Sequence, residues 1–72
     1  MSKATRQLLG QRIRKLRKEN GLTQERLALM VNIQQSYLSR LEAGDRNPSF
    51  DLLVKIADAL GMTLSELFKD IA

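Results

Sequence analysis

The apolar positions between residues 23 and 43 follow two short helical stripes with a tight break between them. The pattern predicts one helix over about 23–31 and another over about 34–43. Their core-facing positions are Leu27, Ala28, Val31, Leu38 and Leu41. Only Asn32 and Ile33 separate the two helices, so the helices must cross steeply rather than lie antiparallel. Asn32 suits such a break because Asn tolerates the left-handed backbone that ends a helix.

The segment before this pair predicts a helix over about 6–20. Apolar residues recur there at i, i+4 and i+7, and they are Leu9, Ile13 and Leu16. Gly21 is expected to end this helix, and residues 1–5 are expected to fray. Gly10 weakens the helix by about 1 kcal/mol relative to alanine. Close packing of a neighbouring element is one reason for a glycine at this position.

The segment after the pair predicts a loop and two more helices. Gly44 to Pro48 has loop composition, and Ser49 can cap a helix over about 50–60. This helix is the expected core helix because its apolar residues exceed one stripe; they are Phe50, Leu53, Val54, Ile56, Ala57 and Leu60. A last helix begins at the capping box Thr63-Leu64-Ser65-Glu66. The sequence thus predicts one all-α domain over 1–72, a compact five-helix bundle.

The helix over 34–43 has a polar face opposite Leu38 and Leu41. Advancing about 100° per residue places on that face Ser36, Ser39, Arg40 and Ala43, with Gln35 and Glu42 on one flank and Tyr37 on the other. Amides, hydroxyls and an arginine are groups that can hydrogen-bond base edges in a DNA major groove. Taken alone, this face fits a solvated surface helix equally well.

The stretch over 23–43 resembles the Cro/XRE-type helix-turn-helix, the lambda-repressor-like DNA-binding domain of many phage and bacterial repressors. The resemblance extends from about Leu9 to Phe68 and rests on Leu22-Thr23-Gln24, Leu27-Ala28, Val31, Gln35-Ser36, Tyr37, Leu38, Leu41-Glu42, Gly44, Asn47-Pro48 and Leu60-Gly61. The sequence departs from the family pattern at two positions. Asn32 stands where the family usually has Gly, and Arg26 stands where a Glu is frequent, so a full capping box is missing there.

The charge distribution agrees with a nucleic-acid partner. The formal net charge is +4, and residues 1–18 hold seven cations and no acid. Residues 49–72 hold two cations and four acids. A basic surface gains from counterion release when it meets phosphates. A basic N-terminus by itself is often only solubilising, but beside a helix-turn-helix it favours DNA binding.

Several other functions lack the residues they need. The sequence has no His and no Cys, so we expect no metal site, no disulfide and no His- or Cys-based catalysis. It shows no nucleophile–base pair and no Gly-rich phosphate loop, so we expect neither an enzyme nor a cofactor. It also shows no membrane-length apolar run and no signal-peptide pattern. We therefore expect a cytoplasmic protein without a membrane partner or a small-molecule ligand.

The resemblance implies roles for individual residues. The candidates for base contacts are Gln35, Ser36, Ser39 and Arg40. Arg40 would favour guanine and Gln35 adenine. Gln24 matches the family's phosphate-contacting glutamine, and the further phosphate candidates are Gln34, Tyr37, Arg46, Asn47, Arg12 and Arg17. Glu42 is expected to be structural, paired with Arg14 or Arg17.

The expected function is sequence-specific binding of double-stranded DNA by a homodimer on an inverted-repeat operator. The residues expected at the dimer interface are Leu64, Leu67, Phe68 and Ile71. The alternative is a protein-interaction module or antitoxin-like partner that uses the same fold without binding DNA. Among DNA-binding regulators, the sequence is compatible with phage-type repressors, antitoxin-like autoregulators and restriction-modification controller proteins, which the compact size particularly resembles.

Overall fold

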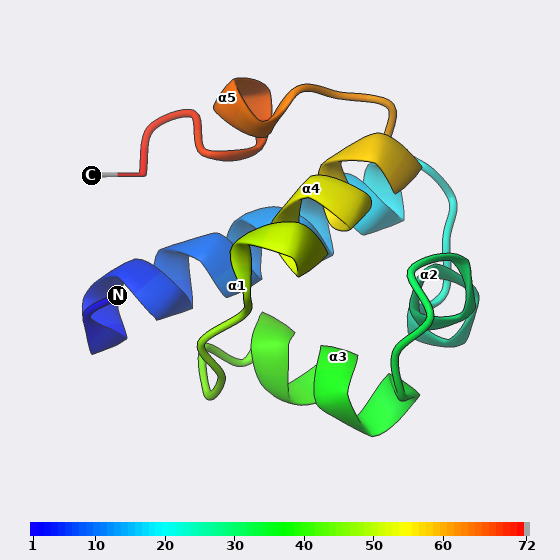
Figure 1. The fold of residues 1–72 in the computed structure, drawn as a ribbon, viewed down its shortest axis with the longest axis horizontal. Helices are drawn as coiled ribbons and strands as arrows, with labels where there is room; N and C mark the ends of the chain where they lie inside the picture. The colour runs from blue at the N-terminus through cyan, green and yellow to red at the C-terminus, as the bar shows by residue number, and fades with distance from the viewer. Residues whose placement is uncertain (72) are drawn as a thin grey trace.

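Five helices make up the regular structure that the computed structural model shows over residues 1–71, the part of the chain it describes (Figure 1). In chain order they are α1 (Lys3–Glu19), α2 (Gln24–Met30), α3 (Gln35–Glu42), α4 (Phe50–Ala59) and α5 (Leu64–Leu67). No strand occurs among these residues, so the predicted all-α, five-helix fold is confirmed. No helix in this range is long and apolar enough to cross a membrane.

Side-chain oxygens cap four of the five helices at their N-termini. The capping residues are Ser2, Thr23, Ser49 and Thr63. The predicted capping box is present, and the backbone N–H of Thr63 donates to Glu66 Oε1 at 2.9 Å. This hydrogen bond lowers the pKa of the Glu66 carboxyl below its ordinary value. The expectation of a frayed start was wrong, because Ser2 Oγ accepts the N–H of Thr5 at 3.1 Å and α1 begins at Lys3.

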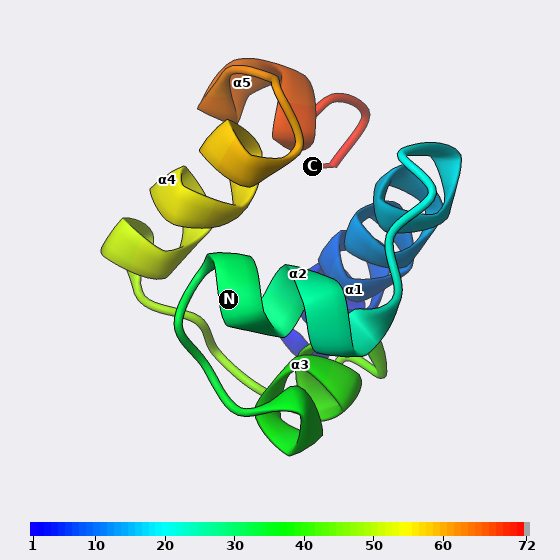
Figure 2. The ribbon, with the colours of Figure 1, turned by 90° about the vertical axis from the view of Figure 1, so that its right-hand side faces the viewer.

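The turn between α2 and α3 has the predicted left-handed residue. Asn32 has a φ of 59°, and the N–H of Ile33 donates back to the carbonyl of Ala28 at 2.9 Å. This closed turn allows the chain to change direction within a few residues, so α3 crosses α2 steeply (Figure 2). The helix-turn-helix arrangement follows from this local geometry.

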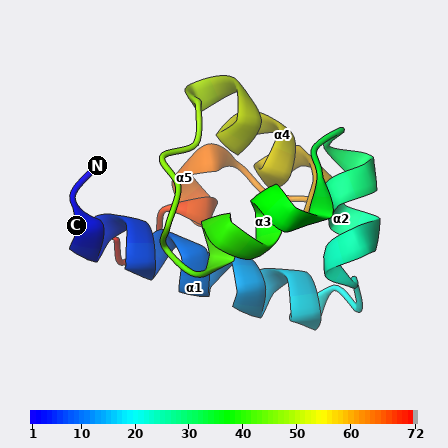
Figure 3. The ribbon, with the colours of Figure 1, turned by 90° about the horizontal axis from the view of Figure 1, so that it is seen from below.

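The core draws on all five helices. Its fully buried large side chains are Leu9, Ile13, Leu27, Leu38, Leu41, Ile56 and Leu67. Helices α1 and α4 lie on opposite sides of the molecule, and α3 lies at the edge away from α5 (Figures 1–3). Four of the apolar residues named for the predicted core helix are buried, namely Leu53, Ile56, Ala57 and Leu60, whereas Phe50 is 66% exposed. Phe50 is the first residue of α4, so its side chain precedes the part of the helix that is buried.

Two glycines allow α1 to approach α3 at backbone distance. A Cβ added at Gly10 would lie 2.5 Å from the carbonyl oxygens of both Leu41 and Glu42. Gly44, with a φ of 80°, ends α3 against Gln7, whose Cα would lie 2.8 Å from an added Cβ. The close packing considered for Gly10 is therefore present. It fixes the C-terminal end of α3 against α1.

Candidate nucleic-acid interface

The outward face of α3 is polar and free of internal partners. Gln35, Ser36, Ser39 and Arg40 are all exposed, whereas Leu38 and Leu41 on the opposite face are buried. None of those four exposed side chains hydrogen-bonds to another residue in the described part of the chain. Because α3 lies at one edge of the molecule, this face can approach a partner without rearrangement (Figures 1 and 2). The predicted base-contacting residues thus share one accessible surface.

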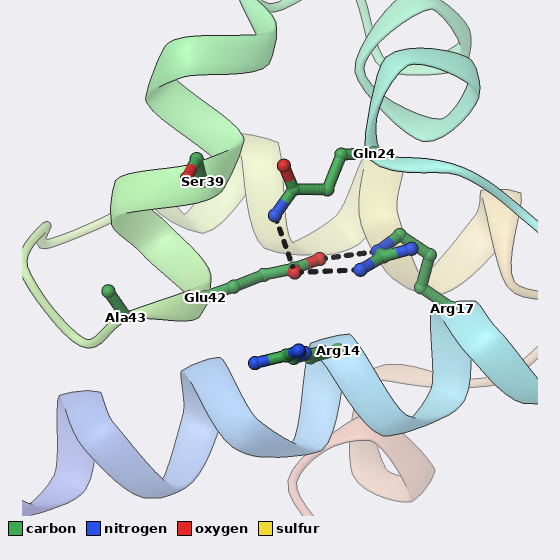
Figure 4. A pocket seen from close by; sticks show the side chains of 6 residues that line it. All are labelled: Arg14, Arg17, Gln24, Ser39, Glu42 and Ala43. Atoms are coloured by element: carbon green, nitrogen blue, oxygen red, sulfur yellow. Dashed lines mark hydrogen bonds and ion pairs between the residues drawn. The ribbon is translucent and has the colours of Figure 1, made fainter.

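A buried ion pair connects α3 to α1. Arg17 donates through Nε to Glu42 Oε2 at 2.7 Å and through Nη2 to Glu42 Oε1 at 3.1 Å (Figure 4). Nη1 of Arg17 donates to the carbonyl of Leu22 at 2.8 Å, at the start of the connection to α2. This bidentate geometry holds both side chains in a fixed orientation. The structural role predicted for Glu42 therefore involves Arg17 and not Arg14.

Gln24 belongs to the same network. Its Nε2 donates to Glu42 Oε1 at 3.0 Å, and the side chain is half-buried at the start of α2 (Figure 4). An amide nitrogen has two hydrogens, so one remains for a further acceptor. Glu42 thus orients the amide of the residue that was predicted to contact phosphate.

Arg12 and Arg17, two of the predicted phosphate contacts, both hydrogen-bond to other parts of the chain. Arg17 is only 6% exposed, and Glu42 and Leu22 occupy its guanidinium. Arg12 faces the C-terminal segment, where its Nη2 donates to the carbonyl of Glu66 at 2.9 Å. Its Nε is buried without a hydrogen-bond partner. Both arginines therefore serve internal contacts, and neither presents a free guanidinium beside α3.

Sequence reasoning missed Arg14 as a member of this surface. Arg14 lines a polar groove of about 440 Å³ between α1, α2 and α3, together with Arg17, Gln24, Ser39, Glu42 and Ala43. The Arg14 side chain is exposed, and it makes no hydrogen bond or ion pair within the described residues. The signal was present in the sequence, because Arg14 lies one turn before Arg17 on the same face of α1.

The other predicted phosphate contacts surround α3. Gln34 is its exposed N-cap residue, and Tyr37 is half-buried against the core. In the loop after α3, Asn47 is exposed, whereas Arg46 is half-buried and donates through Nη1 to the carbonyl of Asp45 at 2.8 Å. Nη1 of Arg46 also lies 3.7 Å from Asp45 Oδ2. Such a surface ion pair is weak and leaves Arg46 able to exchange partners.

The four apolar residues expected at a dimer interface divide into two groups. Leu67 is fully buried within the chain and belongs to its core. Leu64, Phe68 and Ile71 are half-buried and pack around that core while keeping part of their surface exposed. Any contact between copies of the chain through this region would therefore use these three residues and not Leu67.

Comparison with known proteins identifies relatives along most of the chain. A helix-turn-helix family model matches residues 13–67. Control protein C.MunI of Mycoplasma sp is 48% identical over 63 residues, which span 86% of this chain and 85% of that protein. The crystal structure of the restriction-modification controller protein C.AhdI from Aeromonas hydrophila superposes with a TM-score of 0.87 at 42% identity, covering 90% of this chain and 98% of that one. The structure of the biofilm master regulator SinR in complex with DNA gives a TM-score of 0.78 at 35% identity, covering 85% and 98%.

Proposed function

Because this chain belongs to the XRE/Cro-like helix-turn-helix family of DNA-binding transcriptional regulators, which are not enzymes, we propose that it binds an inverted-repeat operator as a homodimer. The observation that carries this proposal is the exposed, unpartnered polar face of α3. The similarity to proteins named as controllers of restriction-modification systems supports a controller-type role for this chain. SinR was solved in complex with DNA, and the similarity of its fold supports DNA binding by this chain.

Base readout is assigned to α3. An arginine can donate two hydrogen bonds to guanine O6 and N7, and a glutamine amide can pair with adenine N6 and N7. Arg40 and Gln35 supply these groups, and Ser36 and Ser39 supply short hydroxyls that allow α3 to approach the bases closely. Gln24, Gln34, Tyr37, Arg46 and Asn47 surround this face and are assigned to phosphates. Phosphate contacts fix orientation on the duplex without reading sequence.

Dimerisation is assigned to the surface formed by Leu64, Phe68 and Ile71. Helices α3 and α5 lie on opposite sides of the chain, so a contact near α5 leaves α3 accessible in both copies (Figures 1 and 2). Two recognition helices of a dimer bind half-sites about 34 Å apart, one turn of DNA. A chain of this size also gains stability when it buries apolar surface against a second copy.

Arg40→Ala is expected to leave the fold intact and to weaken operator binding. Arg40 is exposed and has no internal partner, so its removal costs no core contact. Loss of a bidentate guanine contact should cost about 1–3 kcal/mol on the preferred operator and much less on unrelated DNA. Gln24→Ala should weaken binding to both duplexes by similar factors. The measurement is the affinity of each variant for an operator selected from random DNA and for a scrambled duplex at one salt concentration.

The contrast between the two duplexes decides the assignment. If Arg40→Ala weakens binding to both equally, Arg40 contacts the backbone and the assigned reading face is wrong. If the wild type selects no DNA from the random pool, the alternative of a protein-interaction module gains support. Circular dichroism of each variant serves as the control for folding.

Phe68→Asp is expected to convert the dimer into monomers, because it places a charge among Leu64 and Ile71. Phe50→Asp is the control, since Phe50 is the other phenylalanine of the chain but is 66% exposed and lies at the start of α4. Sedimentation velocity at micromolar concentration should show monomers for the first variant and wild-type behaviour for the second. A wild type that is monomeric at high micromolar concentration would contradict the proposed homodimer of the protein without DNA.

A further inference from the structure

The groove between α1, α2 and α3 contains one cation, Arg14, whose charge is not balanced by an acidic side chain. Glu42 is the only acid among the six lining residues, and its carboxylate already accepts three hydrogen bonds from Arg17 and Gln24. The Arg17–Glu42 pair is therefore neutral as a unit and internally satisfied. Arg14 has no such partner, so the groove carries a net positive charge at its open side. A groove with this charge favours an anion.

The packing of α1 on α3 determines which surface Arg14 faces. Gly10, Arg14 and Arg17 recur at i, i+4 and i+7, so they share the face of α1 that contacts α3. At Gly10 the two helices are in backbone contact, and Arg14 follows one turn later. Its groove neighbours Ser39 and Ala43 lie on the outward side of α3 (Figure 4). Arg14 therefore lies on the flank of the surface assigned to DNA.

We propose that Arg14 binds a backbone phosphate at the mouth of this groove when α3 occupies the major groove. The inference rests on the proposed function and adds a binding residue that the sequence analysis did not include. Arg14 extends from α1, behind the flank of α3, and so it meets the wall of the major groove and not the base edges. Gln24 lines the same groove from α2 and is assigned to a phosphate as well. Together they would fix the angle at which α3 enters the DNA.

The test compares Arg14→Ala with Lys15→Ala. Lys15 is the next residue of α1 and is exposed, but it lines a different hollow beside Lys69 and Asp70 of the C-terminal segment. The two variants remove the same charge, so they change the overall field of the protein similarly. The affinity of each for one operator duplex and one scrambled duplex is measured over a range of NaCl concentrations, and log affinity is plotted against log salt.

Each phosphate contact contributes about −0.9 to the slope of such a plot. Arg14→Ala should make the slope shallower by about 0.9 per contact, or about 1.8 for a dimer, on both duplexes. Lys15→Ala should leave the slope close to the wild-type value. Arg14→Lys keeps the positive charge and should retain the wild-type slope, although a lysine loses the planar fork of the guanidinium.

Equal changes of slope in Arg14→Ala and Lys15→Ala would overturn the inference, because Arg14 would then act only through the general field. That outcome would leave the proposed function standing, since the wild type would still bind DNA with a salt-dependent affinity. A wild type without salt-dependent binding would instead overturn the proposed function, and the inference with it. Circular dichroism confirms that each variant is folded.

Discussion

Glu42→Ala is expected to lower the free energy of unfolding by about 3–5 kcal/mol, the cost of removing one partner from a buried ion pair. Arg17 is 6% exposed and would keep its charge while losing the acceptor for its Nε and Nη2 hydrogen bonds. Gln24 would lose its acceptor as well. A domain of this size has a stability of about 4–11 kcal/mol, so the loss is a large fraction of the total. Urea denaturation at pH 7, followed by circular dichroism, measures it.

The double variant Arg17→Met, Glu42→Leu is the control for this interpretation. It removes both charges together, and apolar replacements of a buried ion pair are often neutral or stabilising. Most of the lost stability should therefore return. Binding to DNA should be weaker than in the wild type for both variants, because Gln24 no longer has the carboxylate that orients its amide. A loss below about 1 kcal/mol in the single variant would show that the pair contributes little to the fold.

The arrangement of helices was predictable because the signals that specify it are local. The stripe of Leu9, Ile13 and Leu16, the left-handed Asn32 and the capping box at Thr63 each depend on residues within one or two turns. The errors also have local causes. Because the side chain of Ser2 caps the helix, α1 begins at Lys3, before the predicted start at about residue 6.

For a helix that packs against other elements on two flanks, it was harder to predict which neighbour each side chain faces. Helix α3 packs on one side only, so its outward face followed directly from the buried positions Leu38 and Leu41. Helix α1 contacts α3 on one flank and the C-terminal segment on another. Periodicity identifies its inward stripe but does not say which neighbour covers each flank. For this reason the sequence could not distinguish Arg12, which meets Glu66, from Arg14, which faces the groove.

Gly10→Ala is expected to destabilise the fold although it raises the intrinsic helix propensity of α1. In an isolated helix, alanine is favoured over glycine by about 1 kcal/mol. In the folded chain the new Cβ would lie 2.5 Å from the carbonyl oxygens of Leu41 and Glu42, and these are backbone atoms at the fixed end of α3. Overpacking costs about 1–3 kcal/mol and sometimes more. Because backbone atoms cannot move aside as a flexible side chain could, we expect the upper end of this cost and a net loss of about 2 kcal/mol, or roughly 8–16 °C in melting temperature.

The sign of the change is the decisive result, since a higher melting temperature for Gly10→Ala would show that α1 and α3 are not in backbone contact. Gly21→Ala is the matched control. Gly21 has a φ of 69° and no atom within 4 Å of an added Cβ, so alanine there should cost only about 1–2 kcal/mol of backbone strain. The two variants should also differ in DNA binding below their melting temperatures. Gly10→Ala displaces α3 from α1, and with it Ser39 from the groove that contains Arg14, whereas Gly21→Ala leaves this interface unchanged.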